Sequence, residues 1–424
     1  MRRSLLLPLI LLAACGGDKA ASGSGGGVVE AKVRDSSGIS IREYPKSSWD
    51  AAKQFALSAK PLMAVGGEEG DTTIDLSAGI MGASSASVGR LLPDGRIVVV
   101  AGQPPQMMVI DTNGKKSGII GRAGEGPGEY RLVTQMLQLG SDTLLAFDMM
   151  RRKGILFGLD GSSRGERDFP TVGSLPIAPT ILGVLNDGTT IHRGDGLSPK
   201  PEAGGDPNSY QLPLPIVALI PGGARYDTLF MVKGIEMYSS TISAGGQTAA
   251  IPRQIGFGKV PQLAVGPEAI WFTPSDKFEI HRRSTGGALL DVIRLDLPTR
   301  EVTDADKAEF KRVLTEALGR VRSMAPAEII DGEIKKLDET KFAKHFPAVG
   351  QMQVDPTGAL WANIGSSPLD STTTWAIFDP TGALQGRVTL PKGGLFAVGK
   401  DRLVIRREDP ATGLVRLEVW GFTR

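Results

Sequence analysis

The chain has 424 residues, with 48 Lys and Arg against 46 Asp and Glu, 55 glycines, 28 prolines and one cysteine. This length fits two or three ordinary domains or one large all-β domain. Glycine is about twice as frequent as its average of roughly 7%, so we expect many tight turns and little helix. A single cysteine excludes an intrachain disulfide. The nearly balanced charge disfavours nucleic-acid binding, which normally needs a strongly basic surface.

The first 15 residues have the pattern of an export signal. Two arginines precede the apolar run 5–12, and this run is too short to span a bilayer. It is followed by Leu-Ala-Ala-Cys, which resembles the lipobox of bacterial lipoproteins, where the cysteine is acylated and becomes the new N-terminus. The resemblance implies a signal peptide over residues 1–14 and a lipid anchor on Cys15, which attaches the protein to a membrane.

The segment after Cys15 is rich in glycine and serine, and we expect residues 15–37 to form a lipid-anchored, flexible tether. Residues 1–14 contain two basic residues and no acidic one, so the mature chain keeps 46 of each sign and is formally neutral. Gly16, rather than aspartate, follows the cysteine. In proteobacteria this favours the outer membrane, so the expected location is the cell envelope.

Six segments of the chain share one pattern, in which an apolar stretch, a Gly, Asp or Asn turn and a second apolar stretch follow one another. They lie at 91–99, 139–147, 184–191, 264–272, 353–361 and 397–405. Each is typical of a β-hairpin. Five of the six continue with another turn and a fourth strand. The pattern therefore predicts an all-β fold, a six-bladed β-propeller with four-stranded blades over residues 38–424.

The last predicted blade reaches the C-terminus one strand short. A ring built in this way must still be closed, because an unpaired strand edge is open to aggregation. Upstream of the first blade, the segment 40–44 alternates between apolar and polar residues. We expect this strand, near Ile41, to pair with the C-terminal strand near Val419.

One segment also resembles a known repeat. Residues 121–130 read Gly-Arg-Ala-Gly-Glu-Gly-Pro-Gly-Glu-Tyr, and Asp148, Arg151 and Arg152 follow them. This arrangement resembles the repeat of NHL-type propellers, where a glycine-rich crossover precedes a blade and an Asp and an Arg bracket the turn before its third strand. The whole chain is similar to the six-bladed propeller lipoproteins of environmental bacteria, most of which have no assigned activity. The glycine-rich motif occurs once, so the resemblance implies a fold and a structural turn brace more than an activity.

Residues 299–350 form the one region without a strand pattern. Thr303 is a suitable N-cap, and apolar residues on one helical face up to residue 321 predict a helix of about 20 residues. Pro326 permits a second helix, with a weaker apolar stripe up to about Phe342. We expect a helical insertion before the fifth blade and not a separate domain.

Motifs for catalysis are sparse. Ser163 lies in a Gly-x-Ser-x-Gly sequence, but a nucleophile elbow needs a strand-to-helix turn, and this turn joins two strands. The only histidines are His192, His281 and His345, and no two are spaced as a metal-binding pair. We therefore predict no catalytic residue and no metal site. His345, between the insertion and a blade, is kept as a candidate for ligand binding.

Three long segments, 193–214, 233–261 and 297–350, all connect strands on the same side of the predicted propeller, which favours one elaborated binding face. Arginine offers planar, paired donors suited to carboxylates. The candidate ligand-binding residues on this face are Arg122, Arg131, Arg151, Arg152, Arg253 and His345. A binding cleft requires at least two of the five guanidinium groups to share a depression without a carboxylate partner. In the alternative, each arginine pairs with a nearby acid and only braces the blades.

Two classes of function stay open. We favour a membrane-anchored binding or scaffold propeller that uses its elaborated face to hold a protein, a peptide or a small ligand, with no cofactor. The alternative, which the resemblance implies, is a lactonase-like hydrolase or a lyase with a divalent metal in the central channel. That site would need oxygen or nitrogen ligands from several blades, and the sequence offers no clear set of them.

Overall fold

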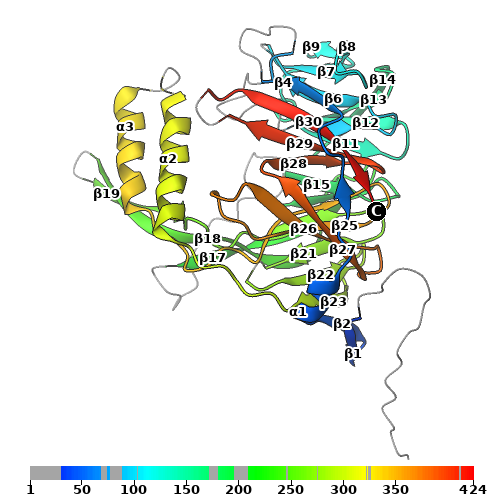
Figure 1. The fold of residues 1–424 in the computed structure, drawn as a ribbon. Helices are drawn as coiled ribbons and strands as arrows, with labels where there is room; N and C mark the ends of the chain where they lie inside the picture. Colours follow the sequence, from blue (N-terminus) through cyan, green and yellow to red (C-terminus); the bar gives the residue numbers. More distant parts are fainter. Residues whose placement is uncertain are drawn as a thin grey trace, which may run out of the picture.

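The computed structural model describes residues 30–67, 74–76, 88–102, 104–170, 180–194, 209–244, 247–274, 276–320, 322, 326–409 and 412–424, without the side chains of 241–250. The described chain is mostly β-strand, arranged in many small sheets (Figure 1). The predicted signal peptide and Cys15 lie outside the described residues. None of the described helices is long and apolar enough to cross a membrane.

Within the described residues, six sheets of four or more strands follow one another along the chain. Sheet I consists of β5 (Gly89–Leu91), β6 (Ile97–Ala101), β7 (Gln106–Ile110) and β8 (Lys116–Ile120). Sheet II consists of β11 (Val133–Leu139), β12 (Thr143–Asp148), β13 (Lys153–Gly158) and β14 (Ser163–Asp168). Between them, β9 (Arg122–Ala123) and β10 (Glu129–Tyr130) form a short parallel pair.

The next two sheets carry additional strands. Sheet III consists of β15 (Thr180–Val184), β16 (Thr190–Arg193), β17 (Tyr210–Leu219), β18 (Asp227–Ala244) and β19 (Gln247–Gln254). Sheet IV consists of β20 (Gln262–Val265), β21 (Ile270–Thr273), β22 (Glu279–Arg283), β23 (Leu289–Leu295), β2 (Ile39–Tyr44) and β1 (Lys32–Ser36). The segment 233–261, expected as a long connection, thus consists mainly of an extended hairpin of β18 and β19, which ends at Gln254.

The last two sheets complete the series. Sheet V consists of β24 (Val349–Val354), β25 (Leu360–Ile364), β26 (Thr372–Phe378) and β27 (Leu384–Pro391). Sheet VI consists of β28 (Gly394–Val398), β29 (Arg402–Glu408) and β30 (Val415–Thr423), joined by β3 (Ala56–Leu57) and β4 (Met63–Gly66). The six predicted hairpins correspond to the first two strands of the six sheets. Gly95 and Gly114, at two of the predicted turns, have φ of 90° and 81°, which explains why glycine stands there.

The first strands of the six sheets lie next to one another. Contacts join β5 to β11, β11 to β15, β15 to β20 and β20 to β24. From β24, Gln351 and Gln353 donate their Nε2 to the carbonyl of Leu395 in β28, at 3.2 and 2.5 Å. Since β28 in turn contacts β5, the first strands close into a ring.

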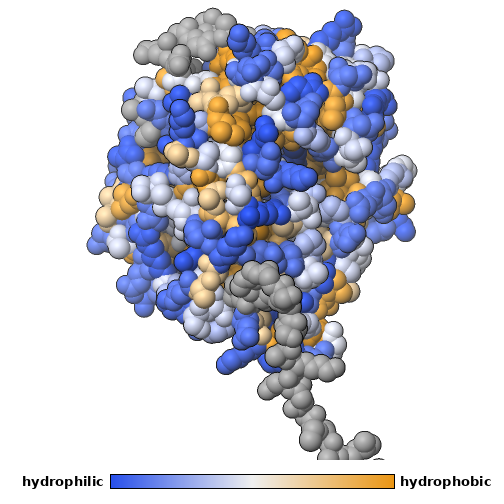
Figure 2. Space-filling view, turned by 45° about the vertical axis from the view of Figure 1, so that its right-hand side comes forward, coloured by the Kyte–Doolittle hydropathy of each residue, from blue (hydrophilic) through white to orange (hydrophobic). Residues whose placement is uncertain are grey.

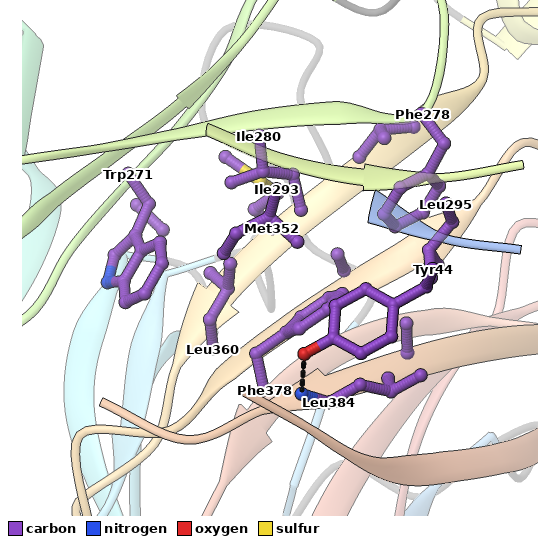
Figure 3. Packing of buried hydrophobic residues seen from close by; sticks show 14 of the residues in the cluster. Tyr44, Trp271, Phe278, Ile280, Ile293, Leu295, Met352, Leu360, Phe378 and Leu384 are labelled. Carbon is purple, nitrogen blue, oxygen red and sulfur yellow. Dashed lines mark hydrogen bonds between the residues drawn. The ribbon is translucent and has the colours of Figure 1, made fainter. Parts of the chain in front are cut away.

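The hydrophobic core is divided into layers, one between each pair of neighbouring sheets. The layer between sheets IV and V contains Trp271 and Ile293 from sheet IV with Leu360 and Phe378 from sheet V (Figure 3). Sheets VI and I share a layer in the same way, so that the last sheet of the series packs on the first. On the face seen in Figure 2, hydrophobic residues lie in separate groups between hydrophilic ones.

The segment 39–66, here called the belt, runs along the outer edges of three sheets before the chain enters sheet I (Figure 1). First, β2 pairs in parallel with β23 of sheet IV, and the short helix α1 (Lys46–Ala51) follows it. Next, Arg387 of β27 in sheet V donates its N–H to the Lys53 carbonyl and accepts from the Phe55 N–H, both at 2.8 Å. Finally, β3 and β4 pair with β30 of sheet VI.

The belt corrects two expectations from the sequence. Ile41 does form a strand, but it pairs with Val292 of sheet IV and not with Val419. The partner of Val419 is Met63, so β4 supplies the outer strand that sheet VI lacks. In addition, Lys32–Ser36 of the expected tether forms β1, which pairs with β2.

Tyr44, at the end of β2, fastens the belt between sheets IV and V. Its side chain is 3% exposed, and its hydroxyl accepts the Leu384 N–H at 3.0 Å (Figure 3). We expect Tyr44→Phe to lower the free energy of unfolding by about 1–3 kcal/mol, because it leaves a buried N–H without an acceptor. Denaturant unfolding measures this. Tyr210→Phe is the control, since no hydrogen bond of its hydroxyl is found among the described residues; equal stabilities of the two variants would contradict the prediction.

Candidate functional site

The helical insertion begins as the sequence predicts. Helix α2 (Asp304–Arg320) follows Thr303, whose hydroxyl accepts the Asp306 N–H at 3.3 Å, while the Asp306 carboxylate accepts the Thr303 N–H at 2.8 Å. This reciprocal pair caps the helix start. Helix α3 (Ala327–Lys336) follows Pro326 and ends in a 3-10 turn (Leu337–Glu339), a few residues before the predicted end at Phe342.

The insertion is fixed to the link between sheets III and IV. Gly256 donates its N–H to the Lys341 carbonyl at 2.7 Å and accepts the Ala343 N–H at 2.9 Å. Beside this pairing, the ring of Phe257 lies 4.7 to 5.8 Å from the rings of its aromatic neighbours. These neighbours are Phe310, Phe342 and Phe346. The aromatic cluster joins α2 and the segment after α3 to one support.

Further contacts tie the insertion to sheets V and VI. Arg300 forms an ion pair with Asp370 at 2.7 Å, and Ser367 donates its hydroxyl to the buried carboxylate of Asp306. Both partners lie between β25 and β26. At the other end of α2, Arg320 pairs with Glu408 of β29 at 2.9 Å. Arg253 of β19 also pairs with Glu333 of α3, and the insertion and the β18–β19 hairpin lie on one side of the ring, as predicted (Figure 1). Of the third expected segment, 193–214, residues 195–208 lie outside the described residues.

A groove with a volume of 590 Å³ lies on the insertion, between α2 and the segment 340–344. Its lining consists of Glu301, Val302, Lys307, Lys311, Thr340, Phe342, Ala343 and Lys344. The floor is held from both sides, because Gly256 accepts the Ala343 N–H and the Lys344 carbonyl accepts the Val302 N–H at 3.0 Å. The lining thus carries three ammonium groups and one carboxylate.

The lysines of the groove form at most solvent-exposed ion pairs with the described residues. Lys307 pairs with Asp304 at 2.7 Å and Lys311 with Asp338 at 3.2 Å, but these two acidic side chains are 97% and 84% exposed. Such surface ion pairs contribute about 0–1 kcal/mol, so an acidic ligand can replace them at low cost. No ion pair of Lys344 is found among the described residues. His345 follows it, with Nε2 4.0 Å from the Glu301 carboxylate, so this predicted candidate lies next to the groove.

The predicted arginines do not form a common cleft. Arg122 pairs with Glu129 at 2.6 Å, Arg131 with Glu125 at 2.8 Å and Arg151 with Glu166 at 2.7 Å. Arg253 pairs with Glu333 of α3 at 3.2 Å. Among the five, Arg152 alone has no carboxylate partner in the described chain, and its side chain is exposed. The expectation of two unpaired guanidinium groups is therefore not met, and the bracing alternative describes this geometry.

The crossover 121–130 shows how the brace works. The carboxylate of Asp148 is fully buried and accepts the backbone N–H groups of Arg131, Leu132, Met150 and Arg151, at 2.7 to 3.3 Å. Glu129 accepts the Gly126 N–H, and this bond together with Arg122 lowers the pKa of its carboxyl. A side chain at Gly124 would collide with Glu129, which explains the glycine. At the end of the crossover, the Tyr130 hydroxyl accepts the Met107 N–H of β7 at 3.0 Å, so the motif also joins sheet II to sheet I.

The remaining histidines have structural surroundings. His192 is fully buried, with its Nε2 2.8 Å from the Thr190 hydroxyl, and His281 contacts Glu279 at 2.7 Å. Ser163 lies at the start of β14, as its strand-to-strand turn predicts. Across the described residues, no group of three or more His, Cys, Asp or Glu side chains could hold a metal ion.

The sequence analysis missed the three lysines of the groove. Lys307 and Lys311 are four residues apart and therefore lie on the same side of α2, a spacing that could have been recognised. Lys344 belongs to an irregular segment that is held at the groove by two hydrogen bonds: Gly256 accepts the Ala343 N–H, and Val302 donates its N–H to the Lys344 carbonyl. This part of the site depends on tertiary structure.

No family model matches this chain, and no curated protein matches it either. Three solved structures share part of its architecture. A member of the DUF4221 family from Bacteroides vulgatus is 9% identical, over 88% of this chain and 99% of that one, with a TM-score of 0.43. An exported protein of Bacteroides fragilis is 12% identical, over 87% of this chain and 96% of that one, with a TM-score of 0.41. A streptogramin B lyase is 10% identical, over 88% of this chain and 99% of that one, with a TM-score of 0.36. With TM-scores this low, nothing about function is transferred from these proteins.

Proposed function

We propose that this protein is an exported, lipid-anchored binding protein, built as a six-bladed β-propeller, that holds an acidic segment of a protein or peptide in the groove on its helical insertion. The ring of first strands and the six core layers support the six-bladed arrangement, in which each sheet is one blade. A crystal structure with a different number of sheets around the ring would disprove this part.

The groove supports the binding role most strongly. Three lysines and one glutamate line it, so its net charge is positive although the mature chain is formally neutral. The aromatic cluster and three ion pairs, those of Arg253, Arg300 and Arg320, hold the insertion. The binding surface is therefore preformed, and little conformational entropy is lost when a ligand binds. A carboxylate-rich segment can replace the exposed partners Asp304 and Asp338.

The binding role is tested with a fluorescent peptide of about ten glutamates, followed by anisotropy at low salt. The double variant Lys311→Glu, Lys344→Glu should bind at least about tenfold more weakly than the unmodified protein, because like charges then face each other. The matched control is Lys115→Glu, Lys116→Glu, at two exposed lysines where the turn after β7 leads into β8. Equal loss in both variants would show unspecific attraction and contradict the groove as the site.

The anchor is a separate part of the proposal and rests on the Leu-Ala-Ala-Cys sequence that ends at Cys15. We expect Cys15→Ser to shift the protein from the membrane fraction to the soluble exported fraction, because no acyl chain can then be attached. Cell fractionation with immunodetection measures this shift. If the variant stays with membranes as the unmodified protein does, the anchor assignment is wrong.

A further inference from the structure

The inner ring contains one cation with an unusual environment. Arg90 lies in β5, the first strand of sheet I, which is hydrogen-bonded to β6 and contacts β11 and β28 on either side. It is half-buried, and its Nε is buried without a hydrogen-bond partner. Within the described part of the chain, no hydrogen bond or ion pair of its guanidinium group is found. Burial lowers the pKa of this group below its ordinary value.

Other polar side chains near the ring do have partners. On β11, Gln135 donates to the Ile181 carbonyl at 3.2 Å and accepts the Ile181 N–H at 3.0 Å. Gln351 and Gln353 donate to Leu395, as described above. These amides join neighbouring first strands, so their geometry is explained by the ring itself. Arg90 makes no such connection.

Arg167 shows how this chain satisfies a half-buried guanidinium when the role is structural. No carboxylate partner of Arg167 is found among the described residues, and its Nε is buried without a partner, as in Arg90. Its two terminal nitrogens, however, donate to the carbonyls of Gly188 and Leu219 at 2.9 Å and to the Thr190 hydroxyl at 3.3 Å. Burial of a cation without such acceptors is unfavourable, because the lost hydration is not replaced. The partial burial of the Arg90 guanidinium thus has a free-energy cost that no described contact offsets.

We propose that Arg90 binds a small oxyanion, a carboxylate or a phosphate group, in the middle of the ring. β5 is the edge strand of sheet I, with β6 on one edge and β11 and β28 as its neighbours in the ring. Among the described residues no strand pairs with its other edge, and this edge, on the inner side of the ring, is where we place the ligand. The planar guanidinium can donate two parallel hydrogen bonds to either anion. In this setting the anion replaces the missing hydration. The site is distinct from the lysine groove and does not depend on the proposed function.

The test is thermal unfolding of the full mature chain with inorganic phosphate in one series and succinate in another. Sodium chloride at equal ionic strength controls for screening. Because a ligand that binds only the folded state stabilises it, the unfolding midpoint should rise by about 3 °C at a hundredfold excess over Kd. A rise with phosphate alone or with succinate alone identifies the preferred anion, and either supports the site. No rise with either anion overturns it.

Variants then locate the response. Arg90→Gln should abolish the rise, and Arg90→Lys should reduce it, since an ammonium keeps the charge but loses the paired donors. Arg416→Gln, at an exposed arginine of β30, should respond as the unmodified protein does. Without added anion, Arg90→Met should raise the midpoint, because it removes a buried, unpartnered cation and keeps most of the apolar stem. A lower midpoint of Arg90→Met would show a structural role for Arg90 and overturn the proposal.

Discussion

Every sheet of this protein depends on closure of the ring, because each layer of the core lies between two neighbouring sheets. If sheets VI and I separated, a whole apolar layer would be exposed to water. The first strands make the inner contact at β28 and β5. At the outside, β4 covers the edge of β30 with main-chain hydrogen bonds, and its Val65 is buried in the layer between sheets VI and I. The belt therefore closes the ring and protects an edge that could otherwise pair with another molecule.

The same belt also contacts the neighbouring sheets IV and V. It adds an outer strand to sheet IV through β2 and contacts sheet V through Arg387 before it reaches sheet VI. Sheets V and VI, together with the β18–β19 hairpin of sheet III, are also the supports of the helical insertion. Sheets V and VI, whose edges contact the belt, thus also position the groove. Ring closure and the geometry of the elaborated face are linked through shared sheets.

The repeated hairpins could be predicted because their determinants are local. Asp94 and Gly95 specify a turn by their local conformational preferences, whatever the rest of the fold is. The apolar residues on both sides specify two strands. The partner of Ile41 could not be predicted in the same way. Alternating residues show that a strand has one buried side, but six similar sheet edges can receive it. The closing strand was missed because Met63–Gly66 is short and ends in glycine, so it lacks a clear alternation.

The candidate site was harder to predict, since its determinants are distant in sequence. The start of α2 at Thr303 follows from local capping, and it was found. The acid that pairs with Arg253 is Glu333, 80 residues away, and the partner of Arg151 comes from β14. The presence of several arginines on the predicted face therefore did not indicate a cleft. Lys344 is held at the groove by hydrogen bonds of its own carbonyl with Val302 and of the Ala343 N–H with Gly256, both of which are distant in sequence.

Hydrogen exchange of the intact protein, followed by mass spectrometry, tests most directly whether the belt closes the ring. If it does, amides of β2 and β4 exchange only when the sheets unfold, with the same protection and the same response to denaturant as those of β6 and β12. The account predicts this common behaviour. Fast exchange in β4 and in the edge of β30, while β6 and β12 remain protected, would show that the ring holds together without the belt and would contradict it.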